Sequence, residues 1–402
     1  MSNEPGASRA SDSADRDRAG EIAKLGDIAA ASGLRRVSML AWRDLDDPEA
    51  GGSEVHASTI AKLWAEAGIE VTMRTSFAAG HPQVTWRDGY RVIRKAGRDL
   101  VFPRGVFSEM MGWHGARDGL VEIWNGMPWF SPVWASGPRI CWLHHHHAEM
   151  WDMTLPRRLA RMGRLLESRI APPFYRRVPI VTLSDSSKRE LIEEMGFKAK
   201  RITVVPPGID PRYTPGTEKS PTPLVVAAGR LVPVKRFEDL IDVLVRVKAT
   251  QPELRAVIVG EGYKREELEA QIHEARAEEW ISLPGRVDDD ELLDLYRRAW
   301  VIASAAAREG WGMTLTEAAA SGTPAVATRI AGHMDAVAHD RSGLLVDGRD
   351  EFVSALDRVL RDTELRRRLS AGAREHAENF TWEATARGTL EVLAAAARRR
   401  RG

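Results

Sequence analysis

The sequence has one cysteine, no long apolar run and almost no net charge, and each of these shortages excludes a class of protein. As the only cysteine, Cys141 cannot form an internal disulfide, so a reducing compartment is expected. No apolar run approaches the roughly 18 residues of a transmembrane helix, and the N-terminus lacks a signal-peptide pattern. The formal net charge of +1 gives no global signal for nucleic acid. We therefore expect a soluble cytoplasmic protein with no nucleic-acid partner.

Short apolar segments alternate with helical segments along the chain after Arg36. Such alternation predicts parallel sheets covered by helices. A stretch rich in proline, from Pro206 to Pro223, interrupts the pattern and predicts an interdomain linker. The expected strands are 37–40, 69–73, 90–94, 121–124, 139–143, 179–183 and 202–205 before the linker, and 224–228, 255–259, 280–283, 300–303, 324–327 and 343–346 after it, with a first helix at 53–67.

The length of 402 residues exceeds what one hydrophobic core usually supports and suits two domains. We predict two doubly wound α/β domains in tandem, with a ligand where the C-terminal ends of the two sheets face each other. Few large apolar residues occur before residue 34, so that segment is expected to be disordered or loosely helical. The predicted parts are the N-terminal segment 1–33, a first domain 34–207, a linker 208–222, a second domain 223–378, and a C-terminal helix with a basic tail 379–402.

The segment 300–322 has the pattern of a strand, a glycine loop and a helix. Gly310 and Gly312 let the backbone approach a ligand, and the free N–H groups at the helix start suit a phosphate. Glu309 and Glu317 cannot bind phosphate, but they accept hydrogen bonds from hydroxyls, which favours a ligand with both phosphate and sugar. The alternative is an ordinary strand-to-helix turn with two solvated glutamates.

Two cations, Arg230 and Lys235, follow the expected strand 224–228 and can project into the same cleft. Arginine binds phosphate oxygens with two parallel hydrogen bonds, and lysine acts as a point charge. Together they can neutralise a diphosphate, although a basic pair at a strand end is often only a surface feature.

These motifs resemble those of the group 1 (family four) nucleotide-sugar glycosyltransferases, from about Arg36 to near the end of the chain. The resemblance implies a GT-B fold of two Rossmann-like domains, with the acceptor on the first and the nucleotide-sugar donor on the second. It further implies retaining transfer of a hexosyl group to an unidentified acceptor. One departure is Arg236, where a glycine commonly follows the lysine. The motifs are EGWGMTLTEAAASGTPAVAT at 309–328, GRLVPVK at 229–235, VVPPGID at 204–210 and GG at 51–52.

The resemblance also implies a role for each candidate residue. Glu309 would bind the hydroxyls of the donor sugar and Glu317 those of the ribose, while Arg230 and Lys235 would stabilise the leaving diphosphate. A histidine near the donor sugar aligns best with His144, with His145 as the alternative. The catalytic candidates are Arg230, Lys235, Glu309 and His144, and the donor-binding candidates are Gly51, Gly52, Arg286, Val287, Gly310, Trp311, Gly312, Met313, Thr314 and Glu317.

Four consecutive histidines, His144 to His147, raise the alternative of a zinc site. Neighbouring side chains on an extended strand point to opposite faces, so all four cannot converge on one ion. The acidic run 288–290 is typical of a polar helix start and not of a metal motif. We expect a reaction without a divalent ion, and no cofactor.

Between Leu155 and Arg177 there are seven arginines and one acid, Glu167. Apolar residues recur there at helical spacing, which is typical of a helix on an anionic membrane surface and equally of a helix packed on the N-terminal sheet. Packing on the sheet is the favoured interpretation, because it needs the same apolar stripe. The membrane alternative predicts a lipid-linked acceptor and a protein at the inner face of the membrane.

Two other functions remain as alternatives. Another GT-B enzyme, such as a sugar-nucleotide epimerase or a phosphorylase, would use the same cleft. A catalytically inactive nucleotide-sugar-binding protein would keep the fold, although the intact Glu309, Glu317, Arg230 and Lys235 argue against it.

Overall fold

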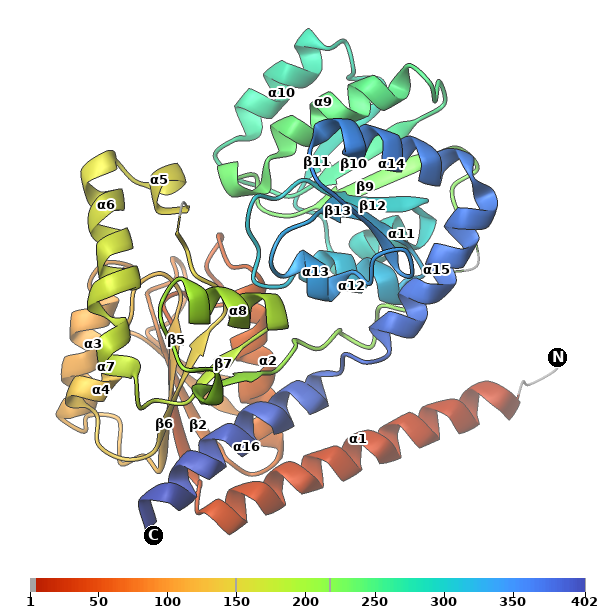
Figure 1. Cartoon of the computed structure of the whole chain (residues 1–402). Coiled ribbons are helices and arrows are strands. Elements are labelled where there is room, and N and C mark those ends of the chain that lie inside the picture. The colour runs from red at the N-terminus through yellow and green to blue at the C-terminus, as the bar shows by residue number, and fades with distance from the viewer. Residues whose placement is uncertain (1–4, 149, 217, 402) are drawn as a thin grey trace.

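Two sheets, each flanked by helices, form the two domains of the chain (Figure 1). The structure is a computed structural model and describes residues 5–148, 150–216 and 218–401. This arrangement confirms the predicted tandem α/β fold. Most strands are short apolar runs buried on both faces, as in β5 (Gly119–Trp124), where all six residues are buried. Because both faces of these strands are buried, their sequences are continuous apolar runs in which apolar and polar residues do not alternate.

The N-terminal sheet has eight strands in the order β3-β4-β2-β1-β5-β6-β7-β8. Only β3 is antiparallel, and it forms a hairpin with β4 through Asp88 and Gly89, both with positive φ. Strand β3 is not among the strands expected from the sequence, although Asp-Gly is a typical signal for such a hairpin turn. The strands are β1 (Arg36–Leu40), β2 (Glu70–Thr75), β3 (Val84–Arg87), β4 (Tyr90–Arg94), β5, β6 (Arg139–Leu143), β7 (Ile180–Thr182) and β8 (Ile202–Val204). The helices are α2 (Gly52–Glu66), α3 (Val101–Met110), α4 (Ser131–Trp134), α5 (Met150–Thr154), α6 (Arg157–Leu165), the π-helical η1 (Leu166–Ile170), α7 (Pro172–Tyr175), α8 (Asp185–Glu193) and the short η2 (Ala199–Arg201).

The C-terminal sheet has six parallel strands in the order β11-β10-β9-β12-β13-β14. The chain moves outward from β9 in one direction and from β12 in the other, so these two neighbours form the switch point where α/β sheets bind ligands. The strands are β9 (Leu224–Ala228), β10 (Arg255–Val259), β11 (Ile281–Gly285), β12 (Val301–Ser304), β13 (Ala325–Thr328) and β14 (Gly343–Val346). The helices are η3 (Pro233–Lys235), α9 (Phe237–Lys248), α10 (Arg265–Glu274), α11 (Asp289–Arg298), α12 (Met313–Ala320), α13 (His333–Ala336), α14 (Arg349–Arg361) and α15 (Thr363–Ala377).

Two terminal helices lie side by side against the N-terminal domain, α1 (Pro5–Ser32) and α16 (Trp382–Arg401) (Figure 1). The expectation of a disordered or loosely helical start is corrected, because Leu25 and Ala29 of α1 are buried in the core that also holds Leu390 and Leu393 of α16. Residues 1–4 of that segment lie outside the described residues. The chain thus returns from the second domain to complete the first.

None of the helices in the described ranges combines the length and the apolar composition needed to cross a bilayer.

Candidate active site

The glycine loop before α2 lies against the start of α12, so the switch points of the two domains meet. A Cβ placed on Gly52 would lie 2.9 Å from Met313 Sδ, and one on Gly51 would lie 3.6 Å from Arg230 Nε. Gly51 is the N-cap of α2, and its N–H donates to Glu54 Oε2 at 2.8 Å. Gly51, and not the following Ser53, therefore caps the helix. Both glycines allow a close approach between the domains.

Two guanidinium groups face the same region from opposite domains. Arg230 follows β9, and burial together with the charge of Arg43 lowers its pKa. Arg43 belongs to the loop after β1, is 6% exposed, and lies 3.4 Å from carboxylate oxygens of both Glu49 and Glu54. Arg43 and Glu54 are not among the site residues expected from the sequence, because their meeting with Arg230 depends on how the domains pack. The repulsion between Arg43 and Arg230 favours an anion between the two guanidinium groups.

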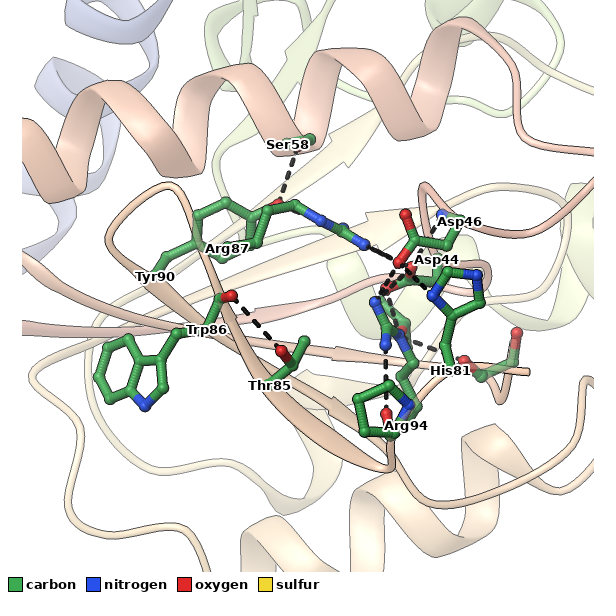
Figure 2. A network of polar contacts seen from close by, with 12 residues as sticks. Asp44, Asp46, Ser58, His81, Thr85, Trp86, Arg87, Tyr90 and Arg94 are labelled. Carbon is green, nitrogen blue, oxygen red and sulfur yellow. Dashed lines mark hydrogen bonds and ion pairs between the residues drawn. The ribbon is translucent and has the colours of Figure 1, made fainter. Parts of the chain in front are cut away.

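The loop after β1 is fixed to the sheet by buried ion pairs, which Figure 2 shows from close by. Asp44 lies 2.9 Å from Arg87 and 3.0 Å from Arg94, and Asp46 pairs with the same two arginines and with His81. Burial raises the pKa of Asp44, but the hydrogen bonds from Arg94 and Arg87 bring it below its ordinary value. These charges hold the loop that ends in the two glycines.

Lys235 and Glu309 form a direct ion pair at the switch point of the C-terminal sheet. Burial would raise the pKa of Glu309, but the charge and hydrogen bond of Lys235 and the charge of Arg230 lower it below its ordinary value, so the carboxylate is ionised. Arg236, which departs from the family pattern, has a φ of 48°. That left-handed conformation suits glycine, which explains the residue usual at this position.

Glu317 lies away from this pair, beside two tyrosines. The hydroxyl of Tyr296 donates to Glu317 Oε2 at 3.3 Å, and the rings of Tyr296 and Tyr213 are 5.8 Å apart. Burial, with added repulsion from Asp210 and Asp289, raises the pKa of Glu317 to about 7. The two glutamates of the motif therefore have different surroundings.

The glycine loop 310–312 is enclosed by histidines. A Cβ on Gly310 would lie 3.1 Å from His145 Nδ1, and one on Gly312, whose φ is 104°, would lie 3.1 Å from His333 Cδ2. His333, which the sequence analysis missed, is buried next to the carbonyl oxygen of Thr328, and burial lowers its pKa to about 4. It is a neutral ring beneath the loop.

The four consecutive histidines contact different groups. The ring of His144 lies edge-on to His56 with centroids 5.0 Å apart, and burial lowers its pKa to about 4. His146 contacts Glu194 and Ser168, whereas His147 lies 3.1 Å from Glu167. Within the described ranges, no group of three histidine, cysteine or acidic side chains could hold a metal ion.

The other candidates flank this centre. Met313 and Thr314 form the start of α12, and the ring of Trp311 packs against Phe380 at 5.0 Å, so its main chain is what can approach a ligand. Arg286 and Val287 follow β11, which β10 separates from β9 and the switch point.

Direct hydrogen bonds join the two domains beside the site. Asp335 accepts the N–H groups of Asp185 at 3.0 Å and Ser186 at 3.2 Å, at the start of α8. Arg308 lies 2.9 Å from Glu190 of the same helix. These contacts hold the two walls of the site together.

Comparison with known proteins supports the same architecture. The family model "Glycosyltransferase Family 4" matches residues 50–213, and "Glycosyl transferases group 1" matches residues 214–376. The chain is 32% identical to a D-inositol 3-phosphate glycosyltransferase of Xylanimonas cellulosilytica, over 91% of this chain and 98% of the relative. Among solved structures it is similar to a sucrose-phosphate synthase of Thermosynechococcus elongatus, with a TM-score of 0.75, 20% identity and coverage of 88% and 97%. Anabaena HepE in complex with UDP and glucose has a TM-score of 0.69, 19% identity and coverage of 90% and 100%.

Proposed function

The chain belongs to the group 1 glycosyltransferases of GT-B fold, and from that premise we propose that it takes a nucleotide-sugar donor and transfers a hexosyl group with retention and without a metal ion. The observation that supports the mechanism is the meeting of Arg230, Lys235 and the start of α12 at one switch point. Positive charge fixed there stabilises a departing diphosphate. Arg43 adds a third cation from the other domain.

We propose separate roles for the two glutamates. Glu309, ionised and paired with Lys235, accepts hydrogen bonds from the hydroxyls of the donor sugar. Glu317, beside Tyr296, accepts them from the ribose. His144 and His145 border the sugar, since the ring of His145 and the carbonyl oxygen of His144 lie against Gly310. Gly51 and Gly52 close over the diphosphate from the opposite wall.

The donor we propose is a UDP-sugar, because the solved structure of HepE holds UDP and glucose. A thermal-shift series with nucleoside diphosphate sugars tests this choice, since a ligand at 100 times its Kd adds about 2.7 kcal/mol to stability. Product analysis then tests the reaction. A transferase releases free nucleoside diphosphate when acceptor is added, an epimerase converts the sugar without releasing it, and an inactive binding protein shows a shift without turnover.

For the acceptor we propose a lipid-linked or glycan hydroxyl, met in the cytoplasm at the inner face of the membrane. Support comes from the apolar stripe of residues 155–170, in which Leu159, Met162 and Ile170 are exposed, whereas Ala171 and Tyr175 further on pack against the sheet. Inositol 3-phosphate, which the names of the relatives contain, is the comparison acceptor in the same assay.

Activity should survive an excess of EDTA, because two cations and a helix start already face the leaving group. The measurement is the rate of nucleoside diphosphate release with and without chelator. Complete loss that magnesium or manganese restores would contradict the metal-free mechanism.

The two glutamates should respond differently to mutation. Glu317→Ala should raise KM for the donor and weaken binding of free nucleoside diphosphate by about tenfold or more, because ribose is bound equally in ground and transition states. Glu309→Ala should mainly lower kcat, because Glu309 is proposed to bind the transferred sugar. It should leave the affinity for free nucleoside diphosphate nearly intact, because the free nucleotide carries no hexose. Calorimetry with nucleoside diphosphate compares the two variants, and Glu309→Gln keeps the shape as a control. A larger affinity loss for Glu309→Ala would reverse the two roles.

A further inference from the structure

Helix α6 and the segments after it leave their apolar stripe facing solvent. Ala160 is the buried residue of α6, whereas Leu159, Leu165 and Met162, the last 64% exposed, point outward. Ile170 and Phe174 continue the stripe, each about half exposed. The favoured sequence interpretation, a stripe packed on the sheet, is therefore wrong.

A second exposed apolar cluster lies on α3 and the loop after it. Phe107, Met110, Met111 and Trp113 are all more than half exposed, and the rings of Phe107 and Trp113 meet edge-on at 5.3 Å. Helix α4, with exposed Val133, contacts both α3 and α7. Figure 1 shows α3, α4, α6 and α7 along one side of the N-terminal domain. We call these exposed side chains of α3, the loop after it, α4, α6, η1 and α7 the apolar face.

Positive charge borders the α6, η1 and α7 part of this face, although Arg164 there pairs with Asp152 of α5. All seven arginines between Arg157 and Arg177 are exposed. The one acid of that stretch, Glu167, is fully buried and accepts hydrogen bonds from the backbone N–H of His147 and from the indole of Trp151, so it offsets no charge at the surface. Isolated exposed apolar residues need no partner, but a clustered set does.

We propose that the apolar face docks on an anionic lipid bilayer. Exposed leucine, methionine and aromatic side chains can enter the boundary between headgroups and acyl chains, while arginines around them pair with lipid phosphates. A second copy of the chain fits less well, since a two-fold interface would bring the same arginines against each other.

The face continues into the active site. Trp151 of α5 packs on α6, because a Cβ on Gly163 would lie 2.6 Å from its ring, and α5 contacts η3, which ends at Lys235. Glu167 joins η1 to the histidine run through His147 at 3.1 Å. Docking there brings the cleft to the bilayer surface, so the acceptor is an amphiphile whose apolar part stays in the membrane. This identification of the acceptor rests on the proposed transferase function, whereas the docking itself does not.

Sedimentation of the full chain with vesicles of phosphatidylglycerol or phosphatidylcholine tests the docking. We expect binding to the anionic vesicles that weakens as salt rises, because exposed charges are screened. Leu159→Ser with Met162→Ser, and separately Trp113→Ser, should each weaken it about tenfold or more, given what burial of such side chains contributes. Trp86→Ser, which alters an equally exposed residue on β3, is the matched control and should bind as the parent does.

Thermal shift with UDP checks that each variant keeps its fold and donor site. Equal binding to both lipids, no loss in the face variants, or loss of a dimer in the same variants would overturn the docking proposal. Intact vesicle binding without any nucleotide binding or turnover would instead contradict the transferase function alone.

Discussion

Arg230→Ala and Lys235→Ala should each lower kcat by about a hundredfold or more, because removal of a preorganised donor to a developing charge has that effect in other enzymes. Both side chains are partly buried at the switch point, where water screens their charge less than in bulk solvent. Their charge is needed most when the diphosphate departs, so the loss should be greater in kcat than in KM for the donor. Steady-state kinetics with saturating acceptor measures both.

Arg246→Ala is the matched control, since Arg246 is an exposed arginine of the same domain that pairs only at the surface with Asp350. We expect no change in its rate. Arg43→Ala tests the third cation, which comes from the N-terminal domain. A lower kcat in this variant would show that Arg43 also stabilises the departing diphosphate. Near-normal turnover in both Arg230→Ala and Lys235→Ala would show that the charge for the departing diphosphate comes from elsewhere.

The sequence predicted those parts of the fold and site that are local in the chain. Buried parallel strands are continuous apolar runs, so strands such as Leu224–Ala228 and Arg255–Val259 were predicted to the residue. The residues of the glycine loop were found in the same way, because strand, loop and helix follow one another. Contacts across the domain boundary have no such local signal. Arg43, Glu54 and Asp335 were therefore missed.

The segment 155–177 shows a different limit of sequence patterns. An apolar stripe with cationic flanks is the same pattern whether the stripe packs on a sheet or faces a membrane. Only the position of the segment relative to the sheet separates the two, and that position depends on α5 and on the buried Glu167. For the N-terminal helix α1 the sequence predicted too little order. Its packing partner α16 lies at the other end of the chain, so no local pattern shows that α1 is packed.

Asp44→Ala should destabilise the N-terminal domain by about 3–5 kcal/mol, the usual cost of removing one partner from a buried ion pair, because Arg87 and Arg94 then share the single carboxylate of Asp46. The Asp44 side chain is 0% exposed and that of Arg94 1%, and the mutation leaves Arg94 with Asp46 as its remaining carboxylate in the pair network. For a domain of this size the loss corresponds to a fall in Tm of roughly 6–20 °C. Differential scanning calorimetry measures it.

Asp350→Ala is the control for Asp44→Ala, because Asp350 forms an exposed ion pair with Arg246 and such pairs contribute about 0–1 kcal/mol. The Asp44 variant should also bind donor more weakly at temperatures where it is folded, since the loop held by Asp44 ends in Gly51 and Gly52, which contact Arg230 and Met313. A Tm equal to that of the Asp350 variant would show that removal of the Asp44 carboxylate costs the domain no stability. A lowered Tm with unchanged donor binding would show that the network stabilises the domain but does not position the glycine loop.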